Sequence, residues 1–162
     1  MGMGRKFDVL VVDDRSIDAE VTLFALRQAS TPDATFLRLK DGNEALRFLF
    51  ALGEFARRSV TLPELVLLDM EMPVTSGPCV LDVIRAHPVT RGIRVIMLTT
   101  DSRPRFDERA GFSADGYLVK SQDFDQYCAA CELMLKRWLP RILKAHHHRA
   151  WPAVQRLTLR SI

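Results

Sequence analysis

The sequence has few cysteines and no long hydrophobic run, and both shortages narrow the classes of protein that it can encode. Cysteine occurs three times among 162 residues, and this odd number excludes a secreted scaffold in which every cysteine is paired. No apolar run approaches the ~18 residues that a membrane-spanning helix needs, and the N-terminus lacks the apolar segment of a secretion signal. We therefore expect a cytoplasmic protein that does not interact with membranes.

Acidic residues are missing from the last part of the chain, and this explains the overall charge. Residues 139–162 contain five basic residues and no acid, whereas residues 1–138 contain 18 basic and 20 acidic residues. The formal net charge of +3 thus belongs to the C-terminal part, and the rest shows no basic excess that would indicate nucleic-acid binding. We predict one domain over residues 5–139 and a basic extension over residues 140–162, either a dimer arm or a disordered tail.

Short apolar runs alternate with segments of helical periodicity along the predicted domain. Strands are predicted over residues 7–12, 35–39, 65–69, 94–98 and 117–119. Helices are predicted over residues 16–28 with Ser16 as the N-cap, from the Asp41-Gly42 turn to Phe50, and over 78–87, 105–110 and 124–138. Fully apolar strands that alternate with helices predict an α/β fold, in which a doubly wound five-stranded parallel sheet is the middle layer of a three-layer sandwich.

Cys128 and Cys131 have the C-x-x-C spacing, which allows two interpretations. A redox site needs this motif at the start of a helix that follows a strand. Here the motif lies inside the last predicted helix, where residues three apart share one face and small apolar side chains pack well. We favour the packing interpretation.

Polar residues follow the apolar runs at the ends of four predicted strands. Asp13 and Asp14 follow the first strand, Asp69 ends the third, Thr99 follows the fourth and Lys120 follows the fifth. Each of these residues alone fits a turn or a helix cap. Because the carboxyl ends of parallel strands lie at one edge of the sheet, where ligands bind in open α/β folds, we expect the five side chains to form one site.

Three carboxylates at one edge would repel each other unless a cation lay among them. A hard divalent ion with oxygen ligands, Mg²⁺, fits such a site. Aspartate carboxylates form aspartyl phosphates, so Asp69 is a candidate nucleophile. Lys120 would then offset the charge of one phosphoryl oxygen, and the Thr99 hydroxyl would donate a hydrogen bond to another.

These residues together resemble the receiver domain of two-component response regulators, which has a flavodoxin-like fold. The resemblance rests on Asp13-Asp14, the segment 69–77 (Asp-Met-Glu-Met-Pro-Val-Thr-Ser-Gly), Thr99, and the segment 116–120 (Gly-Tyr-Leu-Val-Lys). It covers residues 7 to about 138. It implies that a histidine kinase phosphorylates Asp69, and that the protein is not an enzyme beyond its own phosphorylation and dephosphorylation.

The resemblance also implies the roles of individual residues. Asp14 and Asp69 would bind Mg²⁺ together with the main-chain carbonyl of Glu71, and Asp13 would act directly or through water. Tyr117 matches the aromatic switch residue of the family, which turns inward as Thr99 moves toward the phosphoryl group.

A narrower resemblance links the chain to regulators that partner bacterial phytochromes. It rests on the charged stretch 53–63, the turn Pro88-Val89-Thr90, Leu98-Thr99-Thr100, Lys120-Ser121 and a helix that ends near Trp138-Leu139. Ser121 stands where most receivers have a proline. The resemblance implies a stand-alone regulator in phytochrome (light) signalling that forms a homodimer through its C-terminal region.

Other functions remain open on the sequence alone. A receiver of this kind also fits a motility adaptor or an intermediate of a phosphorelay. A pseudo-receiver would bind partners without phosphorylation, although the intact set of site residues argues against it. A dehalogenase-like phosphatase ranks last, since it needs its nucleophile on the first strand and an aspartate two residues later, where this chain has Glu71.

Overall fold

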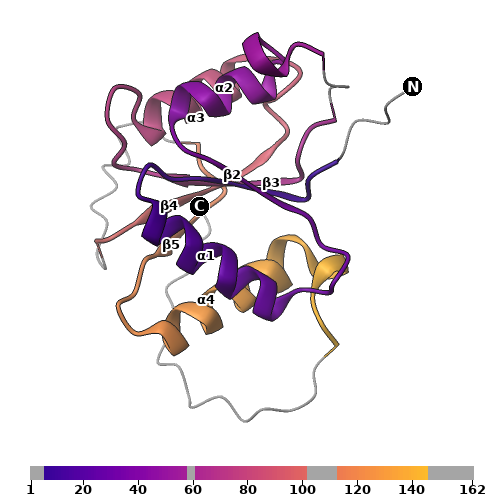
Figure 1. Cartoon of the computed structure of the whole chain (residues 1–162), viewed down its shortest axis with the longest axis vertical. Helices are drawn as coiled ribbons and strands as arrows, with labels where there is room; N and C mark the ends of the chain where they lie inside the picture. Colours follow the sequence, from indigo (N-terminus) through magenta and orange to yellow (C-terminus); the bar gives the residue numbers. More distant parts are fainter. Residues whose placement is uncertain (1–5, 58–60, 102–112, 146–162) are drawn as a thin grey trace.

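The fold is a five-stranded parallel sheet with helices on both faces (Figure 1). The computed structural model describes residues 6–57, 61–101 and 113–145. The strands are β1 (Val9–Val12), β2 (Phe36–Leu39), β3 (Leu65–Asp69), β4 (Arg94–Thr99) and β5 (Gly116–Val119). They lie in the order β2-β1-β3-β4-β5, and every neighbouring pair is parallel. The predicted doubly wound α/β fold is confirmed.

Among the described residues, four α-helices form the outer layers of the sandwich. They are α1 (Ser16–Ala29), α2 (Gly42–Leu49), α3 (Gly77–Ala86) and α4 (Phe124–Trp138), and short 3₁₀ turns follow at η1 (Gly53–Phe55) and η3 (Pro140–Ile142). Figure 1 shows α2 and α3 on one face of the sheet and α1 and α4 on the other. No helix in the described part of the chain is long and apolar enough to cross a membrane.

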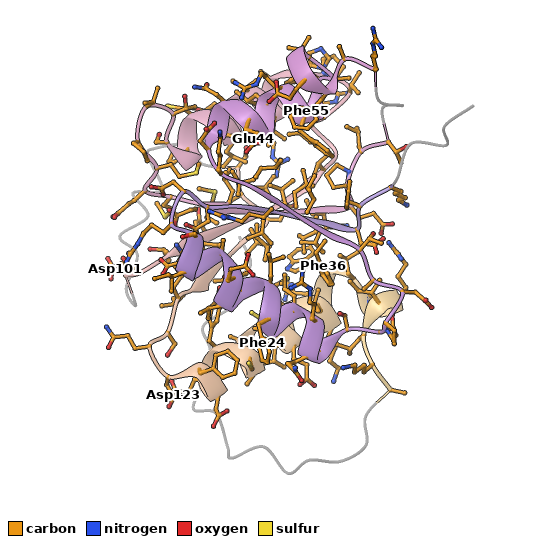
Figure 2. The ribbon with its side chains drawn as sticks, viewed as in Figure 1. Phe24, Phe36, Glu44, Phe55, Asp101 and Asp123 are labelled. Carbon is orange, nitrogen blue, oxygen red and sulfur yellow. The ribbon has the colours of Figure 1, made fainter. Side chains whose placement is uncertain are left out.

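The strands are apolar throughout because both of their faces are covered. Successive side chains point to opposite faces of a strand. In β1, Val9 and Val11 therefore pack with α1 and α4, while Leu10 and Val12 pack with α2 and α3. Figure 2 shows the same division at the periphery, where Phe36 lies on the α1 side of the sheet and Phe55 lies on the α2 side. All five residues of β3 are buried, which fits the central place of that strand.

Aspartates fix the first turns of two helices. The Asp41 side chain accepts a hydrogen bond from the Glu44 N–H at the start of α2, and Asp123 accepts one from the Gln126 N–H at the start of α4 (Figure 2 labels Glu44 and Asp123). Such caps pair backbone donors that have no partner within the helix. They begin the two helices at the positions that the Asp41-Gly42 turn and the Phe124 start predicted.

The predicted cap of the first helix is wrong. Ser16 is the first residue of α1, and the N-cap position belongs to Arg15, whose side chain makes no capping bond. The reason is that the Asp13 carboxylate accepts a hydrogen bond from the Arg15 N–H at 2.9 Å, so the preceding aspartate organises this turn. The helix predicted over residues 105–110 lies outside the described residues.

Cys128 and Cys131 lie in the core between α4 and the sheet, which agrees with the packing interpretation. Both cysteines are buried and free. Burial raises the pKa of the Cys131 thiol far above its ordinary value, so this thiol stays protonated and unreactive.

The first residues of the predicted basic extension pack on the domain. The Thr31 N–H donates to the Ile142 carbonyl oxygen, the Lys144 N–H donates to the Ala29 carbonyl oxygen, and Ser30 pairs with Leu143 in an isolated antiparallel bridge. Ile142 is buried in the α1/α4 core. The chain thus remains attached to α1 beyond the domain boundary predicted at residue 139, and residues 146–162 lie outside the described residues.

Candidate functional site

The predicted site residues meet at the carboxyl ends of β1, β3, β4 and β5. Asp13 follows β1, Asp69 ends β3, Thr99 ends β4 and Lys120 follows β5. The chain leaves β1 toward β2 on one side and reaches β3 on the other, so the site lies where the strand order reverses. Ligands of open α/β sheets bind at such a position.

Three aspartates form one acidic cluster. Asp13, Asp14 and Asp69 each offer a carboxylate oxygen, and these oxygens lie within 4.8 Å of one another. Asp13 is fully buried and Asp69 is 5% exposed. The Asp14 Oδ1 atom is buried and has no hydrogen-bond partner among the described residues. A buried carboxylate oxygen without a donor is costly, and a hard divalent cation is a ligand that would satisfy it, so the three residues fit Mg²⁺.

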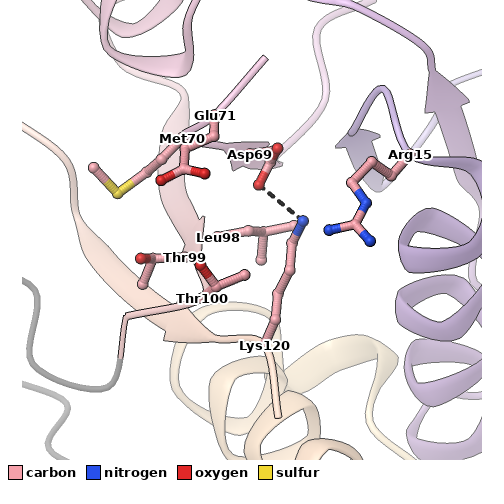
Figure 3. Close-up of a pocket in the computed structure, with 8 residues that line it drawn as sticks. All are labelled: Arg15, Asp69, Met70, Glu71, Leu98, Thr99, Thr100 and Lys120. Atoms are coloured by element: carbon pink, nitrogen blue, oxygen red, sulfur yellow. Dashed lines mark ion pairs between the residues drawn. The ribbon is translucent and has the colours of Figure 1, made fainter. Parts of the chain in front are cut away.

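Lys120 connects the buried acids of this cluster. Its Nζ lies 2.7 Å from Asp13 Oδ2 and 2.8 Å from Asp69 Oδ1, and Figure 3 draws the second contact. A third carboxylate, that of Asp18 on α1, lies 3.4 Å from the same ammonium. Burial by itself lowers the pKa of Lys120, but the hydrogen bonds to Asp13 and Asp69 outweigh it and raise that pKa. Lys120 is therefore charged at neutral pH.

At Asp69, the candidate phosphoacceptor, burial outweighs the ion pair, so the charged form is disfavoured. Burial raises the pKa of Asp69 above its ordinary value, the ammonium of Lys120 opposes this, and the nearby charges of Asp13 and Asp14 add to the rise. The protein thus holds a carboxylate where its negative charge is unfavourable. A bound cation would reverse this balance.

A small pocket opens on one side of Asp69 (Figure 3). Its lining residues are Arg15, Asp69, Met70, Glu71, Leu98, Thr99, Thr100 and Lys120. Thr99 is 7% exposed, and its hydroxyl accepts a hydrogen bond from the Asp101 N–H at 3.1 Å. The Lys120 N–H donates to the Thr99 carbonyl oxygen at 2.7 Å, which joins the ends of β4 and β5.

Gly77 allows the loop after β3 to approach Asp69 closely. The Gly77 N–H donates to the Met70 carbonyl oxygen at 3.2 Å. A Cβ at Gly77 would lie 2.2 Å from the Asp69 carbonyl oxygen and 2.8 Å from Met97 Cε, and both distances are too short for real contacts. The glycine that ends the 69–77 segment is therefore a steric requirement of the site.

The structure does not test the predicted roles of Glu71 and Tyr117. Glu71 lines the pocket, and the role of its main-chain carbonyl as a metal ligand stays a prediction. Tyr117 in β5 is half-buried against the α2/α3 side of the core, and it does not belong to the described lining of the pocket. Its role as a switch also stays a prediction. Sequence reasoning missed Arg15 and Asp18, although both come soon after the Asp13-Asp14 pair.

A doubly wound sheet that gathers three aspartates and one lysine at its switch point defines a class of protein, the receiver-type α/β domains. The family model for the response regulator receiver domain matches residues 9–132. The chain belongs to this family.

The response regulator Rcp1 matches this chain both in sequence and in structure. The chain is 30% identical over 136 residues to the response regulator Rcp1 of Synechocystis sp., which covers 83% of this chain and 90% of Rcp1. The crystal structure of the Mn²⁺-bound form of Rcp1 matches with a TM-score of 0.71 over 85% of this chain and 98% of that chain.

Two further relatives extend the comparison. The structure of the phosphorylated cyanobacterial phytochrome response regulator RcpA is 27% identical and matches with a TM-score of 0.73, over 85% of this chain and 96% of that chain. The probable methanogenesis regulatory protein FilR2 of Methanothrix harundinacea is 34% identical over 136 residues, 82% of this chain and 84% of that protein.

Proposed function

We propose that this chain is a response regulator that accepts a phosphoryl group on Asp69 from a histidine kinase in a Mg²⁺-dependent reaction. The observation that carries the proposal is the contact of one charged lysine, Lys120, with two buried acids of a cluster that fits a divalent cation. Thr99 and Tyr117 would transmit the change to a partner surface. The protein would act in the cytoplasm, as a signalling protein and not as an enzyme with an external substrate.

The proposed chemistry needs little beyond positioning and charge. A carboxylate oxygen of Asp69 attacks the phosphorus of the kinase phosphohistidine, the P–N bond breaks, and the imidazole leaves with the bonding pair and takes up a proton. The product is an acyl phosphate on Asp69. Lys120 would pair with one phosphoryl oxygen and the Thr99 hydroxyl would donate to another. Asp14, Asp69 and the Glu71 carbonyl would hold Mg²⁺, with Asp13 direct or through water, and the ion would offset the negative charge of the phosphoryl group.

Phosphorylation can be tested with a small donor. Acetyl phosphate and Mg²⁺, followed by measurement of the intact mass, should show one added phosphoryl group on the wild type and none on Asp69→Asn. Asp82→Asn is the matched control, because it removes an exposed carboxylate of α3 and should be labelled like the wild type. No added mass on the wild type would favour the pseudo-receiver, whereas continuous hydrolysis of p-nitrophenyl phosphate would favour a phosphatase.

We propose a bacteriophytochrome-type kinase as the partner, and thus a place in light signalling. The match to RcpA, a cyanobacterial phytochrome response regulator, supports this pathway. FilR2 is named as a probable regulator of methanogenesis, so similar regulators are not confined to light signalling. A phosphorelay intermediate or a motility adaptor stays the alternative that the sequence left open. Phosphotransfer from a purified phytochrome kinase should be faster by at least about tenfold than from an unrelated histidine kinase, and equal rates would contradict the assignment.

We also propose a homodimer that uses the C-terminal region. The contacts of residues 142–144 with α1 make Ala145 the right point for truncation, because a shorter chain would also lose these contacts. Light scattering should give twice the monomer mass for the full chain and the monomer mass for a chain that ends at Ala145. An unchanged mass would show that residues 146–162 do not form a dimer arm.

A further inference from the structure

The third carboxylate at Lys120, that of Asp18, has no role in the reaction proposed above. Asp18 lies in the first turn of α1, and its Oδ2 atom is 3.4 Å from Lys120 Nζ and 3.5 Å from Arg15 Nη1. Its side chain is 23% exposed, so it is partly shielded from water. It is not one of the three aspartates whose oxygens lie together. Asp18 therefore contacts the lysine of the site without being a candidate metal ligand.

An ammonium group has three N–H donors, and Lys120 is surrounded by three carboxylates. Two of them, Asp13 and Asp69, would change partners in the proposed reaction, since they would face the cation and the phosphoryl group. Asp18 is the carboxylate that would keep its contact with Lys120 through the reaction.

We propose that Asp18 is a positioning residue that holds the ammonium of Lys120 within reach of a phosphoryl group on Asp69. The inference rests on the proposed function of Asp69. It gives α1 a part in orienting Lys120, which follows β5 and lies 102 positions after Asp18 in the chain.

The backbone of Asp18 is held firmly enough for this role. The Thr22 hydroxyl donates to the Asp18 carbonyl oxygen at 2.9 Å, and the same hydroxyl lies 2.8 Å from the Tyr127 hydroxyl in a buried contact with α4. The next residue, Ala19, is fully buried. A site residue on a rigid, packed helix places its partner more accurately than one on a loop. The ammonium thus has one fixed anchor on α1.

Removal of the Asp18 charge should slow phosphorylation without weakening metal binding to the same degree. In Asp18→Asn, the maximal rate of phosphorylation by acetyl phosphate at saturating Mg²⁺ should fall about tenfold, because the lysine is no longer held in place. The Mg²⁺ concentration for half-maximal rate should change less than about threefold. Asp18→Glu, which keeps the carboxylate, should recover part of the rate. Glu20→Gln is the matched control, since it removes one exposed charge from the same helix and should leave both values unchanged.

A double-mutant cycle and a spectrum test whether Asp18 acts through Lys120. In a Lys120→Gln background, Asp18→Asn should cause no further loss of rate. In the protein without phosphoryl donor, the ¹⁵N signal of the Lys120 ammonium, assigned by its absence in Lys120→Gln, should shift in Asp18→Asn and not in Glu20→Gln.

The outcomes separate this inference from the proposed function. An unchanged rate in Asp18→Asn, equal losses in both backgrounds, or a loss confined to the Mg²⁺ requirement would each overturn the positioning role. If the wild type takes up no phosphoryl group, the proposed function fails. The ammonium signal then still reports whether Asp18 holds Lys120, and an unshifted signal would reject that contact.

Discussion

At the scale of single residues, the loop after Asp69 holds a valine in a backbone conformation that β-branched residues rarely adopt. Val74 has a φ of 67° and is 96% exposed. The Thr75 N–H donates to the Pro73 carbonyl oxygen at 2.8 Å, and such a bond across one residue of positive φ is the strained form of the three-residue turn. The exposed side chain gains almost nothing from burial that would offset a strain of about 1–2 kcal/mol.

Val74→Asn should therefore stabilise the protein by about 1 kcal/mol, because asparagine adopts a positive φ more readily than a β-branched residue does. The free energy of unfolding from urea denaturation measures this. Val89→Asn is the matched control, since Val89 is also exposed but is not among the residues with positive φ, and its effect should stay within about 0.5 kcal/mol. The same gain in both variants would mean that strain at Val74 is not the cause.

Gly77→Ala should destabilise the protein by about 2 kcal/mol and slow the phosphorylation of Asp69. The added methyl group would collide with the Asp69 carbonyl oxygen at 2.2 Å, and relief of such an overlap requires a backbone shift. At Gly92 a Cβ would meet nothing within 4 Å, so Gly92→Ala should change stability by less than about 1 kcal/mol. Urea denaturation and acetyl phosphate labelling of both variants provide the comparison, and equal stabilities would contradict the steric argument.

The residue scale also shows what the sequence could and could not predict about the site. Asp69 and Lys120 were predictable, because each lies at the end of a short apolar run and parallel strands share their carboxyl edge. Asp18 was not, because an acid in the first turn of a helix is also explained by the helix dipole. Its approach to Lys120 depends on how α1 packs on the sheet, and no local pattern encodes that.

At the scale of elements, the start of the basic extension attaches to the amino-terminal edge of the sheet. Arg141 forms ion pairs with Asp8, which precedes β1, and with Glu64, which precedes β3. Lys144 Nζ donates to two carbonyl oxygens in the last turn of α1, those of Arg27 and Gln28, where a positive charge is favourable. Two of the five basic residues of the extension therefore serve to hold it on the domain.

Arg141→Met should lower stability by about 1 kcal/mol at neutral pH, and the loss should disappear in acid. Burial raises the pKa of Asp8, but its hydrogen bonds to Arg141 and Thr35 outweigh this and lower the pKa; the hydrogen bond to Arg141 likewise lowers the pKa of Glu64. A carboxyl with a lowered pKa stabilises the fold above its ordinary value, and this contribution is lost as the pH falls through its value in the folded protein.

The measurement is the difference in unfolding free energy between wild type and Arg141→Met at several pH values. The difference should be constant near pH 7 and should shrink below the ordinary values of 3.8 for Asp8 and 4.5 for Glu64. Lys136→Met removes one exposed charge from α4 and should show no such dependence. A difference for Arg141→Met that persists in acid would mean that lost packing, and not the ion pairs, is responsible.

Element boundaries were predictable where local and tertiary signals agreed. β3 and α4 lie where the sequence predicted them, because a bounded apolar run and a capped amphipathic segment each fix both of their ends. α1 was misread at its start because a serine before a helix normally caps it, whereas here the carboxylate of Asp13 bonds to the chain first. The attachment of Arg141 to Asp8 joins residues 133 positions apart, so the sequence pattern gave no signal for it.

At the scale of the whole molecule, the acidic side chains are matched by cations at the amino ends of the strands and outnumber them at the carboxyl ends. At the amino ends, the acids Asp8 and Glu64 share Arg141, and Lys6 adds a second cation to Glu64. At the carboxyl ends, Asp13, Asp14 and Asp69 lie together, and Lys120 pairs with Asp13, Asp69 and the nearby Asp18. The amino edge is thus neutralised by side chains, while the carboxyl edge keeps an excess of negative charge that a bound cation would offset.

Asp69→Asn should accordingly stabilise the metal-free protein by about 1 kcal/mol at pH 7. Burial raises the pKa of Asp69 above its ordinary value of 3.8. Between that value and the pKa in the folded protein, the folded state holds more protons than the unfolded state, so stability falls as the pH rises through this range.

Mg²⁺ should make the wild type the more stable of the two proteins. At about 100 times its Kd the ion adds about 2.7 kcal/mol to the stability of the wild type and much less to that of Asp69→Asn, which lacks one ligand charge. Thermal unfolding in EDTA measures the stability difference without metal, and thermal unfolding in Mg²⁺ measures the stabilisation by the ion. Asp82→Asn is the control that should follow the wild type. Equal stabilisation of Asp69→Asn and wild type by Mg²⁺ would show that the three aspartates do not share one ion.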